Sequence, residues 1–292
     1  MTFAEKLKGY RKQAGLSQEK LAEKLMVSRQ AITKWETGSG TPDIENMIAI
    51  SELFGVSLDD LLSGEKAEKI SKDYLFESVT EYDIDAVKSY DIKLGGANKV
   101  KLTAYDGEKI IVRLLSNTIS TLQSDFKVKI DDIKNRIDVE MKRFGDMTEA
   151  IAKDALFVVI VIPQKYMWKV EVKVNTRKFE VSGIQCEDIE FDGKTDEVLI
   201  SESKGELELN CNIDMLVTVK SYEGAIEINQ LSSTSRIIVP EDYRFSAARK
   251  GIGTRLSYER NGKGVEDFST DDADNYIELN GVKSELVIST EE

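Results

Sequence analysis

Residues 17–38 read SQEKLAEKLMVSRQAITKWETG, and the apolar residues of this stretch fall at helical spacing in two groups. The groups are Leu21, Ala22 and Leu25, then Ala31, Ile32 and Trp35. Ser17 and Ser28 each stand just before one group, where a hydroxyl can accept a hydrogen bond from a free backbone N–H. We therefore predict two short helices joined by a connection of only a few residues, as in a helix-turn-helix.

The second predicted helix has a polar face opposite its apolar one. That face carries Arg29, Gln30, Thr33 and Lys34, none of which is acidic. A helix that packs by its apolar side and presents such a face outward fits the major groove of DNA, where Arg suits guanine and Gln suits adenine. We predict that all four contact base edges. A phosphate contact is an equal alternative for Lys34, and a plain solvent-facing position is the alternative for Gln30 and Thr33.

The stretch resembles the helix-turn-helix of the Cro and phage-repressor class, often called the XRE family. The matching residues are Gly15-Leu16-Ser17-Gln18, Leu21-Ala22, Leu25, Val27-Ser28-Arg29-Gln30, Ile32 and Trp35-Glu36-Thr37-Gly38. Residues 3–64 also fit the five-helix domain of that family. Arg11 and Glu36 match positions that pair in it, so we expect a partly buried ion pair there. One departure is Met26, which replaces the usual glycine and costs about 1 kcal/mol if the backbone is left-handed.

The resemblance also implies contacts to the DNA backbone. Ser17 and Gln18, at the start of the first helix, are expected to hold a phosphate with help from the helix dipole. Ser28, together with Ser39 or Thr41 in the loop after the second helix, are further candidates for phosphate contacts.

Charge is distributed unevenly along the 292 residues. The net charge of −13 argues against a nucleic-acid binder if taken globally, because phosphate neutralisation dominates such affinity. Residues 1–40 nevertheless hold eight Lys or Arg against four Glu, a net of +4, whereas residues 41–64 carry five acids and no base. The positive charge therefore lies where the predicted groove-facing helices lie.

Residue types that carry catalysis and bind metals are scarce. The chain has no histidine, and its two cysteines, Cys186 and Cys211, lack the spacing of a metal site. We expect no enzyme activity, no cofactor and no metal. Two free thiols fit a reducing cytoplasm, with a disulfide or redox switch as the alternative. The start of the chain has no signal-peptide core and residues 155–162 are too short to span a bilayer, so we expect a cytoplasmic protein.

The pattern changes twice after residue 64. Residues 65–81 are charged and sparse in apolar residues, which is typical of a linker. From residue 82 apolar and polar residues alternate between turn signals, which predicts strands. We therefore expect an all-α domain at 1–64, a linker at 65–81 and a mainly β domain at 82–292.

A repeat of about 19 residues runs through this second half. One column of apolar triplets recurs at 160–162, 179–181, 198–200, 217–219 and 237–239. A second column recurs at 170–172, 189–191, 207–209, 226–228 and 245–247. Two strands per repeat at constant pitch predict a β-solenoid. We expect its core to hold Trp168, Phe179, Phe191 and Phe245, and a final strand at 284–289 to pair with 276–279 across Gly281.

This half resembles the β-helix domains of unknown function that are sometimes labelled adhesins and also occur behind bacterial helix-turn-helix modules. The shared features are a Pro-x-x-Tyr strand start, at Pro163 and Pro240, and a recurring Gly-x-[Ile/Leu]-x-[Ile/Leu].

The two resemblances imply a sequence-specific DNA-binding transcriptional regulator that places residues 28–36 in the major groove of a double-stranded operator. Because the ends of a solenoid present open strand edges, we expect a homodimer held mainly by residues 82–292. The β domain is a candidate site for an unknown effector. The alternative is an interaction or scaffold protein whose β domain binds a partner or an envelope ligand, with DNA binding secondary.

Overall fold

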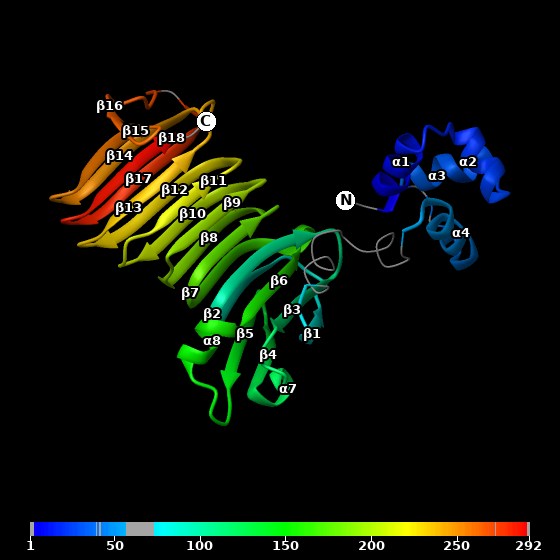
Figure 1. The fold of residues 1–292 in the computed structure, drawn as a ribbon, viewed down its shortest axis with the longest axis horizontal. Coiled ribbons are helices and arrows are strands. Elements are labelled where there is room, and N and C mark those ends of the chain that lie inside the picture. The colour runs from blue at the N-terminus through cyan, green and yellow to red at the C-terminus, as the bar shows by residue number, and fades with distance from the viewer. Residues whose placement is uncertain (1–2, 39, 41, 57–72, 272, 291–292) are drawn as a thin grey trace. The chain divides into compact units, whose positions relative to one another are not determined.

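The computed structural model describes residues 3–38, 40, 42–56, 73–271 and 273–290, which fall into two compact units divided after Asp73 (Figure 1). The described part of the first unit contains α1 (Phe3–Gln13), α2 (Gln18–Leu25), α3 (Arg29–Glu36) and α4 (Ile44–Phe54). The two helices predicted within residues 17–38 are therefore confirmed. The fifth helix of the expected domain, and most of the expected linker, lie outside the described residues.

Capping residues set the bounds of these helices. Ser17, Ser28 and Asp43 precede α2, α3 and α4, and each side-chain oxygen accepts a hydrogen bond from a backbone N–H three residues further on. α2 ends at Met26, whose backbone is left-handed with φ 54° and ψ 36°. Methionine therefore occupies the conformation that usually selects glycine.

The helices pack around a small apolar core. Its buried members are Leu7, Leu21, Ala22, Leu25, Ile32, Trp35 and Ile50. Burying a leucine or isoleucine side chain stabilises a fold by about 1.5–3 kcal/mol. Since Ile32 and Trp35 anchor α3 in this core, the opposite side of α3 must face outward.

The second unit is built from strands. Its described part contains β1 (Phe76–Asp83), β2 (Lys88–Tyr105), β3 (Lys109–Ser116), β4 (Phe126–Ile133), β5 (Arg136–Arg143), β6 (Phe157–Pro163), β7 (Met167–Ser182), β8 (Gln185–Lys194), β9 (Glu197–Ser201), β10 (Ser203–Cys211), β11 (Leu216–Val219), β12 (Tyr222–Leu231), β13 (Thr234–Val239), β14 (Phe245–Ile252), β15 (Arg255–Arg260), β16 (Lys263–Val265), β17 (Asn275–Val282) and β18 (Glu285–Thr290). Short helices α7 (Leu122–Asp125), α8 (Glu149–Ala155) and η1 (Gln164–Tyr166) lie between strands.

Most of these strands stack in parallel in two columns, with one strand of each coil in each column. The first column runs β6, the second half of β2, the second half of β7, β9, β11, β13, β18 and β15. The second runs β5, the first half of β2, the first half of β7, β8, β10, β12, β17 and β14. The predicted β-solenoid is confirmed.

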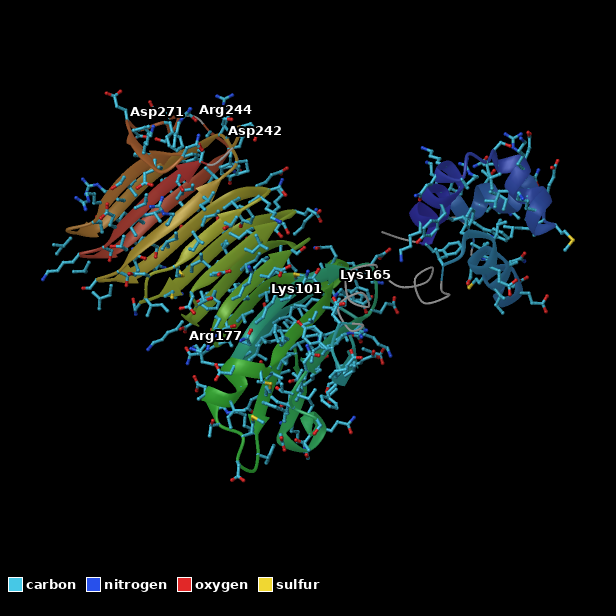
Figure 2. All side chains as sticks on the ribbon, viewed as in Figure 1. Lys101, Lys165, Arg177, Asp242, Arg244 and Asp271 are labelled. Atoms are coloured by element: carbon cyan, nitrogen blue, oxygen red, sulfur yellow. The ribbon has the colours of Figure 1, made fainter. Side chains whose placement is uncertain are left out.

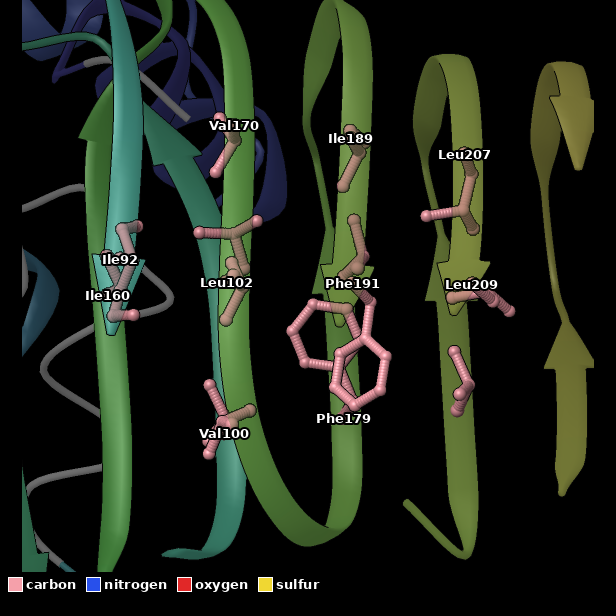
Figure 3. Close-up of a cluster of buried hydrophobic side chains, with 14 of the residues drawn as sticks. Ile92, Val100, Leu102, Ile160, Val170, Phe179, Ile189, Phe191, Leu207 and Leu209 are labelled. Atoms are coloured by element: carbon pink, nitrogen blue, oxygen red, sulfur yellow. The ribbon is translucent and has the colours of Figure 1, made fainter. Parts of the chain in front are cut away.

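The core of the solenoid consists of apolar rows that run along the stack. Val170, Ile189 and Leu207 form one such row on β7, β8 and β10 (Figure 3). The rings of Phe179 and Phe191 also pack together inside, with centroids 4.8 Å apart. Phe245 is buried as expected, but Trp168 is 52% exposed. A β-bulge between β2 and β7 shifts the register beside Trp168 and turns this residue outward.

The order of the coils differs from the order of the chain at both ends. β2 lies between β6 and β7, so residues 160–162 and 179–181 are not neighbours. At the other end β17 lies between β12 and β14, so residues 226–228 pair with β17 instead of 245–247. On β14 the partner of the buried Leu279 is Arg249, which is exposed, and an exposed charge at this position suits a terminal coil better than an internal one.

Two further expectations are wrong. Residues 276–279 and 284–289 do not pair across Gly281, because β17 lies between β12 and β14 whereas β18 lies between β13 and β15. β18 is thus an internal strand. Residues 76–81, which we assigned to the linker, belong to β1, which pairs antiparallel with β3 and packs Phe76 against the core.

Charged side chains cover the outside of this unit, Lys101 and Arg177 among them (Figure 2). Many are paired: the Arg177 Nη2 to Asp154 Oδ1 distance is 2.6 Å, and the Lys101 Nζ to Glu180 Oε1 distance is 2.8 Å. One outward row of the second column is acidic over seven neighbouring strands. Its members are Asp138, Asp91, Glu171, Glu190, Glu208, Glu227 and Glu278. Like charges opposite each other on neighbouring strands are destabilising.

Cys186 and Cys211 are both free thiols. Burial raises the pKa of the Cys186 thiol to about 12. Across the described ranges, no helix combines the length and the apolar character that crossing a membrane requires.

Candidate nucleic-acid interface

The outward side of α3 carries the four residues predicted to contact bases. Arg29, Gln30, Thr33 and Lys34 are all exposed, while Ile32 of the same helix is fully buried. The N-cap Ser28 fixes where the helix begins, and the buried residues fix its rotation. The structure thus brings the four side chains onto one accessible helix face.

Arg29 has a partner that the sequence did not indicate. Its Nη1 lies 3.0 Å from Oε1 of Glu19 on α2, and the two side chains are 63% and 65% exposed. Exposed pairs of this kind contribute only about 0–1 kcal/mol. Arg29 can therefore leave Glu19 at little cost. The partners are ten residues apart on different helices, so their contact depends on tertiary packing.

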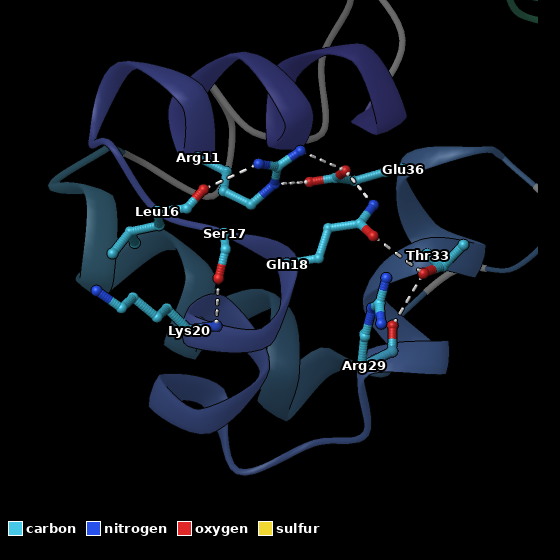
Figure 4. A network of polar contacts seen from close by, with 8 residues as sticks. All are labelled: Arg11, Leu16, Ser17, Gln18, Lys20, Arg29, Thr33 and Glu36. Atoms are coloured by element: carbon cyan, nitrogen blue, oxygen red, sulfur yellow. Dashed lines mark hydrogen bonds and ion pairs between the residues drawn. The ribbon is translucent and has the colours of Figure 1, made fainter.

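A polar network fixes α1, α2 and α3 relative to one another (Figure 4). Arg11 binds Glu36 through two contacts, Nε to Oε1 at 2.5 Å and Nη2 to Oε2 at 2.9 Å, which confirms the expected ion pair. Gln18 donates from Nε2 to Glu36 at 2.8 Å, and its Oε1 accepts from the Thr33 hydroxyl at 3.3 Å. Gln18 therefore links the buried ion pair to the exposed face of α3.

The charge states in this network follow from burial and hydrogen bonding. Burial alone would raise the pKa of Glu36, but hydrogen bonds from Arg11 and Gln18 outweigh it and hold this pKa below its usual value. The hydrogen bond to Glu36 raises the pKa of Arg11. Both groups stay charged at neutral pH, so the ion pair holds the helices together under physiological conditions.

Ser17 and Ser28 serve first as helix caps. Their hydroxyl oxygens accept from the backbone N–H of Lys20 and Ala31, each at 3.1 Å, and both side chains are exposed. A capping hydroxyl still has its own hydrogen to donate, so a phosphate oxygen remains a possible acceptor. Ser39 and Thr41, the other candidates, lie outside the described residues.

The sequence analysis did not include Lys20 among the candidates for a phosphate contact. This exposed residue lies in the first turn of α2, and the Ser17 hydroxyl caps its backbone N–H. Its position three residues after Ser17, a predicted phosphate contact, could have indicated it.

A family model described as Helix-turn-helix matches residues 7–61. The HTH-type transcriptional activator BcrR of Enterococcus faecalis is 53% identical over 66 residues, 23% of this chain and 32% of that protein. The transcriptional regulator YqaE of Bacillus subtilis is 48% identical over 71 residues, 24% of this chain and 61% of that protein. A regulator of Methanocaldococcus jannaschii is 43% identical over 63 residues, 22% of this chain and 96% of that protein. The match thus spans less than two thirds of the length of the first two relatives.

Two solved structures also align. The P22 c2 repressor, solved with a synthetic operator, is 33% identical and aligns over 22% of this chain and 97% of that one, with a TM-score of 0.22. A candidate cell adhesion protein of Clostridium sporogenes is 12% identical and aligns over 74% of this chain and 100% of that one, with a TM-score of 0.36.

Proposed function

The chain belongs to the helix-turn-helix family of transcriptional regulators, and we propose that it regulates transcription by binding an operator in double-stranded DNA. The observation that carries this proposal is the exposed, acid-free face of α3 formed by Arg29, Gln30, Thr33 and Lys34. Its width and chemistry suit the major groove, where Arg and Gln can each form paired hydrogen bonds with one base.

The remaining candidates act on the DNA backbone. Ser17, Gln18 and Ser28 stand at the N-termini of α2 and α3, where hydroxyls, free N–H groups and the positive helix end favour a phosphate. Lys20 adds an exposed cation beside them. Ser39 and Thr41, which follow α3 in the sequence, complete the proposed set.

The second unit serves assembly or sensing in this proposal. A single helix-turn-helix module reads only a few base pairs, so regulators of this type place two recognition helices about 34 Å apart. We therefore propose that the chain acts as a homodimer held mainly through its β unit, which is also a candidate site for an effector.

Arg29→Ala tests the assignment of the reading face. Once selection from genomic fragments with the full-length protein has defined a site, this variant should lose about 1–3 kcal/mol on that site and relax preference at one base position. It should lose little on random DNA. Binding titrations on both DNAs measure the difference. Lys12→Ala, which removes an exposed cation from α1, is the matched control and should change neither.

Two outcomes contradict the proposal. Equal losses on both DNAs for Arg29→Ala rule out base readout by this residue. A wild-type protein that enriches no fragment in the selection rules out sequence-specific binding altogether.

A further inference from the structure

Three long strands have an unpaired edge within the described part of the β unit. β1 pairs only with β3, β4 only with β5, and β14 only with β17. An unpaired edge presents a row of free N–H and C=O groups, which is a template for another strand. The side chains of these strands decide which edges accept one.

Two of the edges carry the features that discourage pairing. β14 carries Arg249, Lys250 and Gly251 just before its last residue, Ile252, and Arg249 pairs with Leu279, where a further coil would need an apolar residue. β4 carries Lys127 and Lys129, and Asp131 and Asp132 precede its last residue, Ile133. Edge lysines, glycine and inward-pointing charges all oppose edge-to-edge association.

The edge of β1 lacks those features. Its sequence, FESVTEYD, contains no Lys, Arg, Gly or Pro. Val79 and Tyr82 are 43% and 38% exposed, and Leu75, just before the strand, is 76% exposed. β-Branched and aromatic residues of this kind favour strand pairing. β1 is therefore the edge best suited to receive a strand.

Two of the three carboxylates of β1, Glu77 and Glu81, have ion-pair partners within the same chain. Oε1 of Glu77 lies 2.9 Å from Nη1 of Arg113, and Oε2 of Glu81 lies 3.2 Å from Nζ of Lys109, both on β3. A second β1 strand would meet little net repulsion there, although its own residues are acidic. The edge is thus compatible with a copy of itself.

We propose that two copies of this chain pair through the outer edges of β1, antiparallel and across a two-fold axis. This proposal rests on the proposed function, because a regulator that needs two DNA-reading modules needs a second copy of the chain at the edge of β1. β1 begins three residues after Asp73, where the first unit ends. In an antiparallel pair of eight-residue strands the two starting points lie roughly 25 Å apart.

Val79→Lys in the full-length protein tests the interface. It places two charges beside the proposed axis at an exposed position, so the dimer dissociation constant should rise at least about tenfold. Light scattering over a concentration series measures it, and circular dichroism checks the fold. Ile133→Lys, at a 47% exposed position on β4, is the matched control and should remain dimeric. Leu75→Lys serves as a second variant if Val79→Lys does not fold.

DNA binding separates this proposal from the proposed function. Val79→Lys should bind a single half-site as the wild type does and lose only the tight binding to paired half-sites. A monomeric wild type, or a Val79→Lys variant as dimeric as the wild type, overturns the β1 interface. A dimer that dissociates with Val79→Lys yet selects no DNA retains the interface and overturns the proposed function.

Discussion

Met26 is one departure from the family that the sequence resembles, and the structure shows what this departure involves. Its backbone is left-handed, and its side chain is 93% exposed. The Cβ atom therefore carries a steric cost in the turn, with almost no burial of the side chain to offset it. The turn persists because Ser28 and the apolar residues of α2 and α3 determine it.

Met26→Gly should therefore raise the free energy of unfolding of the helical unit by about 1 kcal/mol. Thermal unfolding followed by circular dichroism at a helix-sensitive wavelength measures the gain. Met26→Ala is the control, because it shortens the side chain but keeps the Cβ atom, and it should give no comparable gain. A similar gain for both variants would mean that the exposed side chain, and not the backbone conformation, carries the cost.

Single residues differ in how much of their role the sequence predicts. Ser17 and Ser28 were predictable as caps because a cap depends on neighbours three residues away. The links from Glu19 to Arg29 and from Gln18 to Glu36 were not, because they form only once α2 and α3 have packed. The exposed face of α3 was predictable from the helical period alone.

Among the elements, the acidic row of the second column makes the solenoid sensitive to pH. Burial, and then the neighbouring carboxylates of Glu278 and Glu208, raise the pKa of Glu227. A raised pKa means that the folded state binds this proton more tightly than the unfolded state does. The charged form therefore costs stability at neutral pH, and that cost disappears as the pH falls through the raised value.

Glu227→Gln should accordingly stabilise the solenoid at pH 7 by a few tenths to about 1 kcal/mol, and the gain should shrink toward pH 4. Denaturant unfolding at several pH values measures it.

Glu180→Gln is the control of opposite sign. Burial alone would raise the pKa of Glu180, but Lys101 and Lys99 outweigh it and lower this pKa. The charged form is therefore stabilising above the ordinary pKa, and the variant should be less stable at pH 7. Equal effects of the two variants would contradict the role of the acidic row.

The strands themselves were largely predictable, whereas their order was not. The alternation within each strand and the step of about 19 residues both follow from the local sequence. The insertion of β2 between β6 and β7, and of the β17–β18 coil before β14 and β15, depends on which distant faces fit best. The spacing of a repeat along the chain therefore does not predict the order in which its coils stack.

For the molecule as a whole, opposite charges on its parts predict how salt affects DNA binding. A net of +4 over residues 1–40 lies within a chain of −13. Binding to the selected site should fall steeply with salt, and binding to random DNA should be weak. Titrations at several salt concentrations measure the log–log slope, and a flat slope would contradict phosphate contacts.

The same titrations decide the role of Lys34. If Lys34 contacts a phosphate, Lys34→Ala should reduce the log–log slope by about 1. If Lys34 contacts a base, Lys34→Ala should weaken binding to the selected site and leave the slope nearly unchanged. Lys12→Ala should leave both the affinity and the slope as they are in the wild type.

The insertion of the β17–β18 coil also has a consequence for the newly made chain. When the ribosome has finished β13, the growing stack ends in strands whose next neighbours are β17 and β18, which have not been translated. At about 5–20 residues per second, those neighbours follow only after roughly 3–10 s. During that interval β14 and β15 emerge with no permanent place to dock. The nascent chain therefore exposes the unpaired edges of β12 and β13 to chaperones and to other nascent chains until β17 and β18 pair with them.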